Sequence, residues 1–301
     1  MCSEPSLSPD CHGWRRPGRT LLPLSPLILP MGLLFLGGLA LALAQSLGFW
    51  LPVSHQSEVL DAYKAALAPH YLASMAFSLT VAFVSAGLSV AFGTLGAWAM
   101  WNMPPLLQRA SMIYKMGLIL PHMAVAFVVL ILWSRTGFIS AIAFHMGLVD
   151  DPGQFPAILH SGNGAGMIIA FVAKETPFAM LLALAVLART DRRLVQVARM
   201  LGAGPVRIFV SVVLPRLTPA LHTAFIILFL YTLGAFDIPF LLAESRPGML
   251  SIEIYNLYFK RELTDRPTAM ALLVVLFVFS VAFIMVYSHV ASRLEDRVRK
   301  L

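Results

Sequence analysis

Five long, mostly apolar stretches of this chain contain no charged residue, and they constrain its fold more than any other feature. No Asp, Glu, Lys or Arg occurs in Thr20–Ser57, Ala65–Gln108, Met116–Ser134, Leu217–Phe236 or Pro267–Ser292. An α-helix needs about 20 mostly apolar residues to cross a bilayer. Charged residues make up only 12% of the 301 residues, whereas an ordinary soluble domain has about 25%. The sequence therefore predicts an all-α, polytopic membrane protein.

Six transmembrane helices are predicted when the fourth apolar region, which contains two charged residues, is included. We expect them at Leu21–Trp50, Leu72–Trp101, Met112–Ser134, Gly166–Ala188, Thr218–Ala243 and Thr268–Ser288. The uncharged run Thr136–Val149 has 14 residues, which is short for a span, so we expect a surface helix in an outside loop. The chain then divides into a tail (1–20), a first helix with an external loop (21–71), a core (72–290) and a second tail (291–301).

The distribution of basic residues predicts the orientation in the membrane. With the N-terminus inside, the inside segments hold 15 of the 22 Lys and Arg residues, as the positive-inside rule requires. We therefore expect a multi-pass membrane protein with both termini in the cytoplasm. The net charge of +7 reflects this topology rather than nucleic-acid binding, because no basic patch is interleaved with exposed aromatic residues.

The N-terminal region leaves one alternative open. The apolar run that ends in LALAQ, with a small-residue site at Ala42–Ala44, resembles a cleavable signal peptide. The run is longer than the roughly 7–15 residues of a signal core, so we favour an uncleaved first span. Cys2, Cys11 and His12 lie in the tail before it, and three ligands of this kind are weak evidence for a metal site.

A basic segment, RRLVQVARMLGAGPVRIFVSVVLPRL (Arg192–Leu217), lies between the fourth and fifth spans. Helical spacing places one set of side chains on an apolar face and another on the opposite, polar face. The apolar set is Leu194, Val197, Ala198 and Leu201, and the polar set is Arg192, Gln196 and Arg199. Gly202 and Gly204 suit the end of this helix, and Pro205 suits the first turn of a second one. An amphipathic connector that rests on lipid headgroups would show the same periodicity.

The spacing within this segment is more specific than its periodicity. Gln196-Val197-Ala198, Gly202 and Val212-x-Leu214-Pro215 follow the frame E-A-A-x-x-x-G-x(9)-I-x-L-P. This frame resembles the cytoplasmic EAA loop of binding-protein-dependent ABC importer permeases, in which a short coupling helix docks on the ATPase subunit. Ala198, Gly202, Leu214 and Pro215 match it, and Ala203 completes the usual Gly-Ala pair, whereas Gln196 and Val197 replace the usual Glu and Ala.

The resemblance implies a non-catalytic subunit of the bacterial inner membrane with several partners. These are ABC ATPase subunits that carry ATP and Mg²⁺, a second and different permease subunit, an external substrate-binding protein and membrane lipid. No G-x-x-x-x-G-K-[ST] phosphate loop occurs in the chain, and SGNGAG at Ser161–Gly166 is interpreted as a loop. AKETPF (Ala173–Phe178), GAFDIPFLL (Gly234–Leu242) and RPTAMA (Arg266–Ala271) are similar to segments of the subgroup that transports polyamines, phosphonates and related solutes.

Charged residues inside the spans are candidates for the translocation pathway. Lys174 and Glu175 lie within the fourth span and Asp237 in the fifth, and such residues usually face a cavity or a partner. The alternative is an interhelical ion pair of Lys174 with Asp237. Pro177 and Pro239 follow these charges, and we expect helix breaks there that face one another as an outer gate.

Two other classes of membrane protein are alternatives to a permease subunit. An ion-coupled secondary transporter or channel would use Lys174, Glu175 and Asp237 for coupling, but no inverted repeat is visible. An intramembrane enzyme would need a convergent set of ligands or nucleophiles, and the histidines show no HExxH-like spacing. The second span also carries small residues that predict close helix packing, namely Ser85, Ala86, Gly87, Gly93 and Gly96.

Overall fold

The computed structural model describes residues 18–49, 60–104, 114–160, 162–243 and 248–299, and every regular element in these ranges is helical. The main helices are α1 (Gly18–Ser46), α2 (Asp61–Ala66), α3 (Pro69–Asn102), α5 (Met116–Ile119), α6 (His122–Trp133), α7 (Phe138–His145), α8 (Ala165–Leu187), α9 (Arg192–Met200), α10 (Pro205–Ile208), α11 (Leu214–Gly234), α12 (Asp237–Leu242), α13 (Leu250–Tyr255) and α14 (Arg266–Arg299). The predicted tail with Cys2, Cys11 and His12 lies outside the described residues.

Six helical stretches of the described chain are long and apolar enough to cross a membrane, which confirms the predicted number. They are Ser25–Ser46, Pro69–Asn102, His122–His145, Ala165–Leu187, Pro205–Gly234 and Leu263–Arg293. The third stretch is interrupted by a turn between α6 and α7, and α7 has only 8 residues. The uncharged run that begins at Thr136 therefore forms a short helix rather than a span of its own, as predicted.

Helices α3, α8 and α11 pack against one another at the centre of the molecule. The side of α3 that faces them carries small residues, and Ser85, Ala86, Ser89 and Gly93 are all buried. A methyl group added at Gly93 would lie 2.7 Å from Ala179 Cβ on α8. The small residues of the second span thus allow close packing with the fourth, because no side chain separates the two backbones at Gly93.

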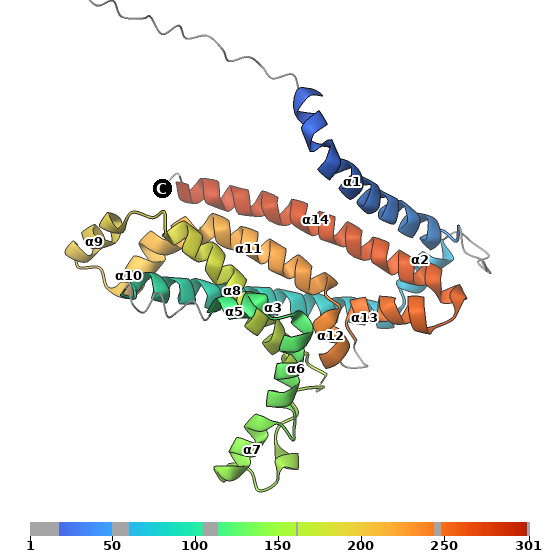
Figure 1. Cartoon of the computed structure of the whole chain (residues 1–301), viewed down its shortest axis with the longest axis horizontal. Helices are drawn as coiled ribbons and strands as arrows, with labels where there is room; N and C mark the ends of the chain where they lie inside the picture. The colour runs from blue at the N-terminus through green and yellow to red at the C-terminus, as the bar shows by residue number, and fades with distance from the viewer. Residues whose placement is uncertain (1–17, 50–59, 105–113, 161, 244–247, 300–301) are drawn as a thin grey trace, which may run out of the picture.

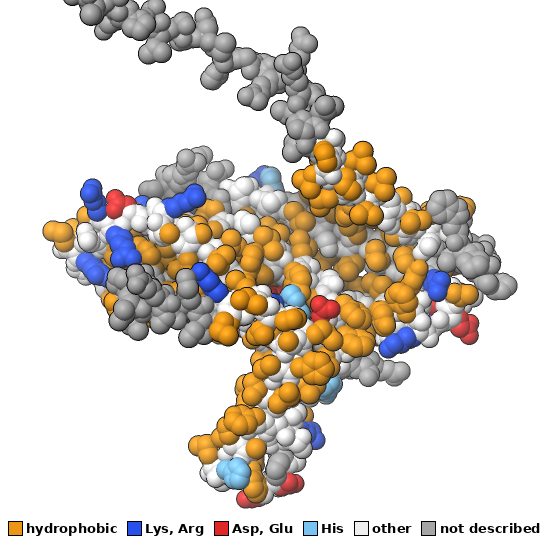
Figure 2. All heavy atoms as spheres, in the orientation of Figure 1, with side chains coloured by type: hydrophobic (Ala, Val, Ile, Leu, Met, Phe, Trp, Pro, Cys, Tyr) orange, Lys and Arg blue, Asp and Glu red, His pale blue; other side chains and the backbone are white. Residues whose placement is uncertain are grey.

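The other helices lie around this centre (Figure 1). Helix α14 packs on α11, α13 and α2, and α1 packs on α14. Helices α9 and α10 lie at one end of the molecule, and α2 and α13 lie at the other. Helices α6 and α7, which we call the arm, project from the centre, and hydrophobic side chains are prominent where the arm leaves the centre, whereas polar and charged side chains also appear at its far end (Figures 1 and 2).

Two of the predicted spans are broken, and each break lies beside a proline. In the third span the chain is extended at Leu120 and Pro121, between α5 and α6. In the fifth span α11 ends at Gly234, and α12 begins at Asp237. In their described parts, the spans predicted at Met112–Ser134 and Thr218–Ala243 are therefore each made of two helices, and a break in the fifth span was predicted.

The two prolines that were expected to break helices behave differently from one another. Pro177 lies inside α8, which continues through it, so the predicted break in the fourth span is wrong. Pro239 lies in the first turn of α12, where backbone N–H groups have no helical partner and proline costs nothing. The break in the fifth span includes Ala235, whose carbonyl could not accept a helical hydrogen bond from Pro239, so the predicted break beside this proline is confirmed.

Candidate functional site

The basic segment folds into a helical hairpin, and its sequence explains each turn. Helix α9 begins after Asp191, whose side chain accepts a hydrogen bond from the backbone N–H of Arg193 at 2.9 Å. It ends at Gly202, which has a φ of +80°. The N–H groups of Gly202 and Ala203 donate to the carbonyls of Arg199 and Ala198 at 2.9 and 3.0 Å. This is the Schellman arrangement, which requires a residue in the left-handed region.

The structure also explains the second half of the sequence frame, from Gly204 to Pro215. Gly204 is extended and precedes α10, where Pro205 occupies the first turn. A π-helical turn, Phe209–Val213, joins α10 to α11, and Pro215 lies in the first turn of α11. Because proline cannot donate to the carbonyl four residues earlier, the wider π-helical turn accommodates it without ending the helix. The predicted order of short helix, turn and second helix is confirmed.

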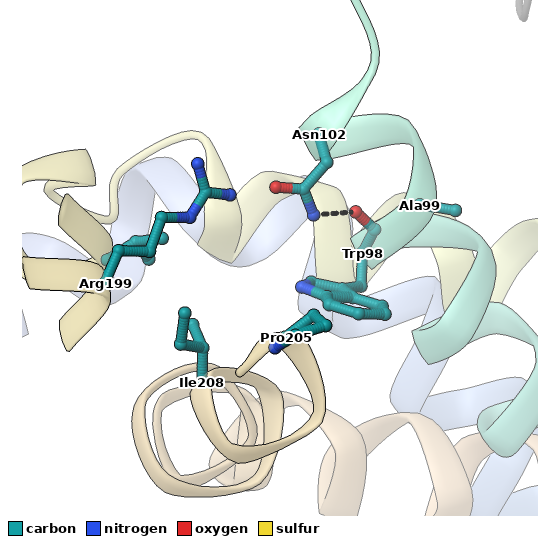
Figure 3. Close-up of a pocket in the computed structure, with 7 residues that line it drawn as sticks. Trp98, Ala99, Asn102, Arg199, Pro205 and Ile208 are labelled. Atoms are coloured by element: carbon teal, nitrogen blue, oxygen red, sulfur yellow. Dashed lines mark hydrogen bonds between the residues drawn. The ribbon is translucent and has the colours of Figure 1, made fainter. Parts of the chain in front are cut away.

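The hairpin is fixed to the end of α3 (Figure 3). Arg192 Nη2 donates to the carbonyl of Trp101 at 3.1 Å, and its guanidinium carbon lies 5.1 Å from the centre of the Trp101 ring. Trp98 contacts Phe209 with ring centres 4.9 Å apart. Between the hairpin and α3 lies a cavity of about 320 Å³, which Trp98, Asn102, Val195, Arg199 and Ile208 help to line. A shift of α9 would therefore directly change its contacts with α3.

Most of the apolar face that helical periodicity predicted for α9 does not pack on this chain. Val195 is buried and Ala198 is half-buried, both in contact with the core at this end. Leu194, Val197 and Leu201 are 39%, 53% and 82% exposed, and Met200 is 87% exposed. Arg199 lines the cavity rather than the opposite face. The predicted apolar face exists, but it points away from this chain, and Gln196 is exposed as well.

We predict that the two glycines of the turn respond differently to alanine. Gly202→Ala places a side chain at positive φ and should destabilise the end of α9 by about 1–2 kcal/mol. Gly204→Ala is the matched control, because Gly204 is extended and a methyl group would meet no atom within 4 Å at either position. Amide hydrogen exchange across α9 measures the difference. Equal protection in the two variants would contradict the assignment of strain to Gly202.

Lys174 on α8 is buried against the break in the third span. Its ammonium group donates to the carbonyls of Gly117, Leu118 and Leu120 at 3.0, 3.1 and 2.6 Å. All three N–H donors of the lysine therefore have an acceptor. The alternative of an ion pair with Asp237 does not hold in the described part of the chain, and the side chain of Asp237 is exposed.

Glu175, the next residue along α8, joins the three central helices. It is 3% exposed, and its Oε1 accepts a hydrogen bond from Thr232 Oγ1 of α11 at 2.5 Å. Its Oε2 accepts from Ser89 Oγ of α3 at 3.5 Å. Because adjacent residues of a helix point about 100° apart, Lys174 reaches the third span while Glu175 reaches the second and fifth.

Sequence reasoning missed several of these partners. Ser89 and Thr232 carried no signal beyond being small polar residues in a span, and backbone carbonyls carry none at all. Pro177 lies on the same face of α8 as Lys174, and a methyl group added at Gly117 would lie 2.8 Å from Pro177 Cγ. A translocation role for Lys174, Glu175 and Asp237, and a gate at Pro177 and Pro239, stay predictions.

Comparison with known proteins identifies the family to which this chain belongs. Residues 89–300 match the family described as binding-protein-dependent transport system inner membrane component. The chain belongs to this family. The matched region contains the hairpin, both breaks and the Lys174–Glu175 pair, so the family assignment covers every residue of the candidate site.

Relatives of this family member include two curated permease proteins. The chain is 29% identical over 160 residues to the sn-glycerol-3-phosphate transport system permease protein UgpA of Pectobacterium atrosepticum, covering 50% of each chain. It is 28% identical over 182 residues to the molybdenum transport system permease protein ModB of Azotobacter vinelandii, covering 60% of this chain and 76% of that one. The match thus spans half the length of the first relative and three quarters of the second.

A solved structure shares the fold of this family member. The crystal structure of a bacterial alginate ABC transporter in complex with its alginate-bound periplasmic protein contains a chain that superposes with a TM-score of 0.73. The superposition covers 92% of this chain and 94% of that chain, at 18% identity. At this identity the likeness shows a shared arrangement of helices and carries no statement about what is transported.

Proposed function

We propose that this protein is the membrane-spanning permease subunit of an ATP-driven ABC importer. In this proposal α9 and the turn to α10 dock on a separate ATPase subunit, which binds ATP and Mg²⁺. An external binding protein delivers a small solute, and a second, different permease subunit completes the pathway. The family match, the fold and the sequence frame of the hairpin support this function over an ion-coupled secondary transporter or channel.

The proposal rests on the exposed apolar face of α9. Four large apolar side chains, Leu194, Val197, Met200 and Leu201, are exposed at the end of the molecule. Arg193 and Arg207 are exposed beside them on α9 and α10. An exposed apolar patch with a polar rim is typical of a protein–protein contact. The Gly202 turn fixes the patch at the tip of the hairpin, where a partner can reach it.

The packing of α8 provides a route from this surface to the spans. Only four residues, Ala188–Asp191, separate the end of α8 from the start of α9. Movement of α9 with a closing ATPase dimer would therefore displace α8. Glu175 and Lys174 connect α8 to the second, third and fifth spans. Alternating access then follows as a rocking of these spans that opens the pathway to one side at a time.

The substrate and the orientation remain proposals from the sequence. The segments AKETPF and GAFDIPFLL suggest a polyamine, a phosphonate or a related solute. The relatives described above carry glycerol 3-phosphate and molybdenum in their names, so they give no support to this subgroup. Both termini are proposed to lie in the cytoplasm of a bacterial cell, since this puts the basic hairpin on the side where ATP is available.

Purification of the chain from its native membrane in mild detergent tests the proposal. We expect an ATPase subunit to co-purify in stoichiometric amount with the wild-type protein. Leu201→Glu should lower its recovery at least about tenfold, because burying one large apolar side chain contributes roughly 1.5–3 kcal/mol.

Met146→Glu is the matched control, since Met146 is 69% exposed on the arm, away from the hairpin. It should leave recovery unchanged. Wild-type protein that carries no ATPase, or equal recovery with Leu201→Glu, would rule out α9 as the docking helix.

A further inference from the structure

The buried ammonium group of Lys174 occupies a site made of three backbone carbonyl oxygens. They belong to Gly117, Leu118 and Leu120, at the end of α5, and lie 2.6–3.1 Å from Nζ. Lys174 is 8% exposed. A buried ammonium group is costly unless each of its protons has an acceptor. Here the protein supplies three acceptors, and none is an acidic side chain.

These oxygens are free because the helix is broken beside them. In a continuous helix the carbonyl of Gly117 would accept from the N–H of residue 121, but that residue is Pro121 and has none. Leu120 and Pro121 have ψ values of 132° and 149°, so the chain is extended there and α6 starts anew at His122. Unpaired carbonyls at the end of a helix carry partial negative charge, which a cation stabilises.

We infer that Lys174 is a positioning residue whose ammonium group holds the break between α5 and α6 and so sets the direction of the arm. Gly117 packs on Pro177, one turn along the same face of α8. The break is therefore fixed to α8 by both a close backbone contact and a charged group. This inference goes beyond the proposed function, because it concerns the third span and holds whether or not an ATPase binds α9.

A positioning role and a pathway role of Lys174 predict different results when the lysine is replaced. A lysine that served only to contact a passing solute would change transport when removed and would leave the arm in place. A lysine that holds the break would leave three unsatisfied carbonyls when removed, and the arm would lose its fixed direction. The vacated site would also accept a small free ammonium ion, because its geometry matches that of the lost group.

Distances between spin labels measure the direction of the arm. Labels are attached through Met146→Cys on the arm and Met285→Cys on α14, both exposed positions, in full-length protein with Cys2→Ser and Cys11→Ser. We expect one narrow distance distribution for wild-type Lys174. Lys174→Met, which keeps the length but not the charge, should lose the narrow component. In Lys174→Ala, whose short side chain leaves room for a small cation, methylammonium should restore it, whereas tetramethylammonium, a cation without N–H groups, should not.

Lys115→Met is the matched control, because Lys115 is exposed at the start of α5. It should leave the distribution narrow. If Lys174→Met does not fold, Gly117→Ala gives the second test, since its methyl group would press on Pro177 and move the carbonyls away from Nζ. An unchanged distribution in the folded variant, or rescue by tetramethylammonium equal to that by methylammonium, would overturn the inference.

Discussion

Gly93→Val should lower the free energy of unfolding by about 3 kcal/mol, one of the two largest effects that we expect from a single change in the described chain. A Cβ atom at Gly93 would lie 2.7 Å from Ala179 Cβ, 2.8 Å from the backbone nitrogen of Met180 and 3.0 Å from the carbonyl oxygen of Thr176. Two of these atoms belong to the backbone of α8 and cannot rotate away. The second and fourth spans would have to separate.

Gly87 offers a control on the same helix, because a Cβ atom there would meet nothing within 4 Å. Gly87→Val should leave stability almost unchanged, since valine is a slightly better helix former than glycine. Unfolding of both variants in mixed micelles, followed by circular dichroism during an SDS titration, gives the comparison. Equal stability of the two variants would show that α3 and α8 do not approach each other at Gly93.

Glu175→Ala should lower the free energy of unfolding by about 2–4 kcal/mol. The change removes the acceptor of two hydroxyl groups, on Ser89 and Thr232, and leaves a cavity among α3, α8 and α11. Hydrogen bonds between membrane helices contribute on average about 0.6 kcal/mol each, so the cavity accounts for most of the loss. Glu175→Gln fills the same space and still accepts one bond, so its effect should be smaller.

Glu262→Ala is the control for this prediction, because Glu262 is exposed outside the central helices. The same SDS titration should show no loss of stability for it. A loss for Glu175→Gln as large as that for Glu175→Ala would mean that the negative charge, rather than the shape and hydrogen bonding of the side chain, holds the three helices together.

Much of the hairpin could be predicted from the sequence, because its determinants are local. The positive φ of Gly202 and the proline at the start of α10 depend on a few neighbouring residues. The side of α9 that packs on the bundle depends instead on α3, which precedes it by about 90 residues. Periodicity identified an apolar face correctly, but it did not show that Leu194, Val197 and Leu201 would be exposed, because a pattern does not say which surface covers it.

For the Lys174–Glu175 pair, too, one part could be predicted from the sequence and another depends on the packing of the helices. Two charged residues in an apolar span predict partners within the protein, but their identities depend on which helices lie beside α8. An acidic partner was the natural expectation for Lys174, and the structure supplies backbone carbonyls instead. A broken helix provides such acceptors only when its end comes close to the charge, and no residue type marks that approach.

The sequence by itself determined that this chain is an all-helical membrane protein with six apolar helices and a basic hairpin. These features follow from hydrophobicity, charge and local turn chemistry, which act over a few residues. Only the tertiary structure decided that Pro177 is tolerated within α8, that the third helix is broken beside Lys174, and that Glu175 joins three spans. Each of these depends on whether neighbouring helices can satisfy a freed backbone group or a buried charge, and that is a property of packing.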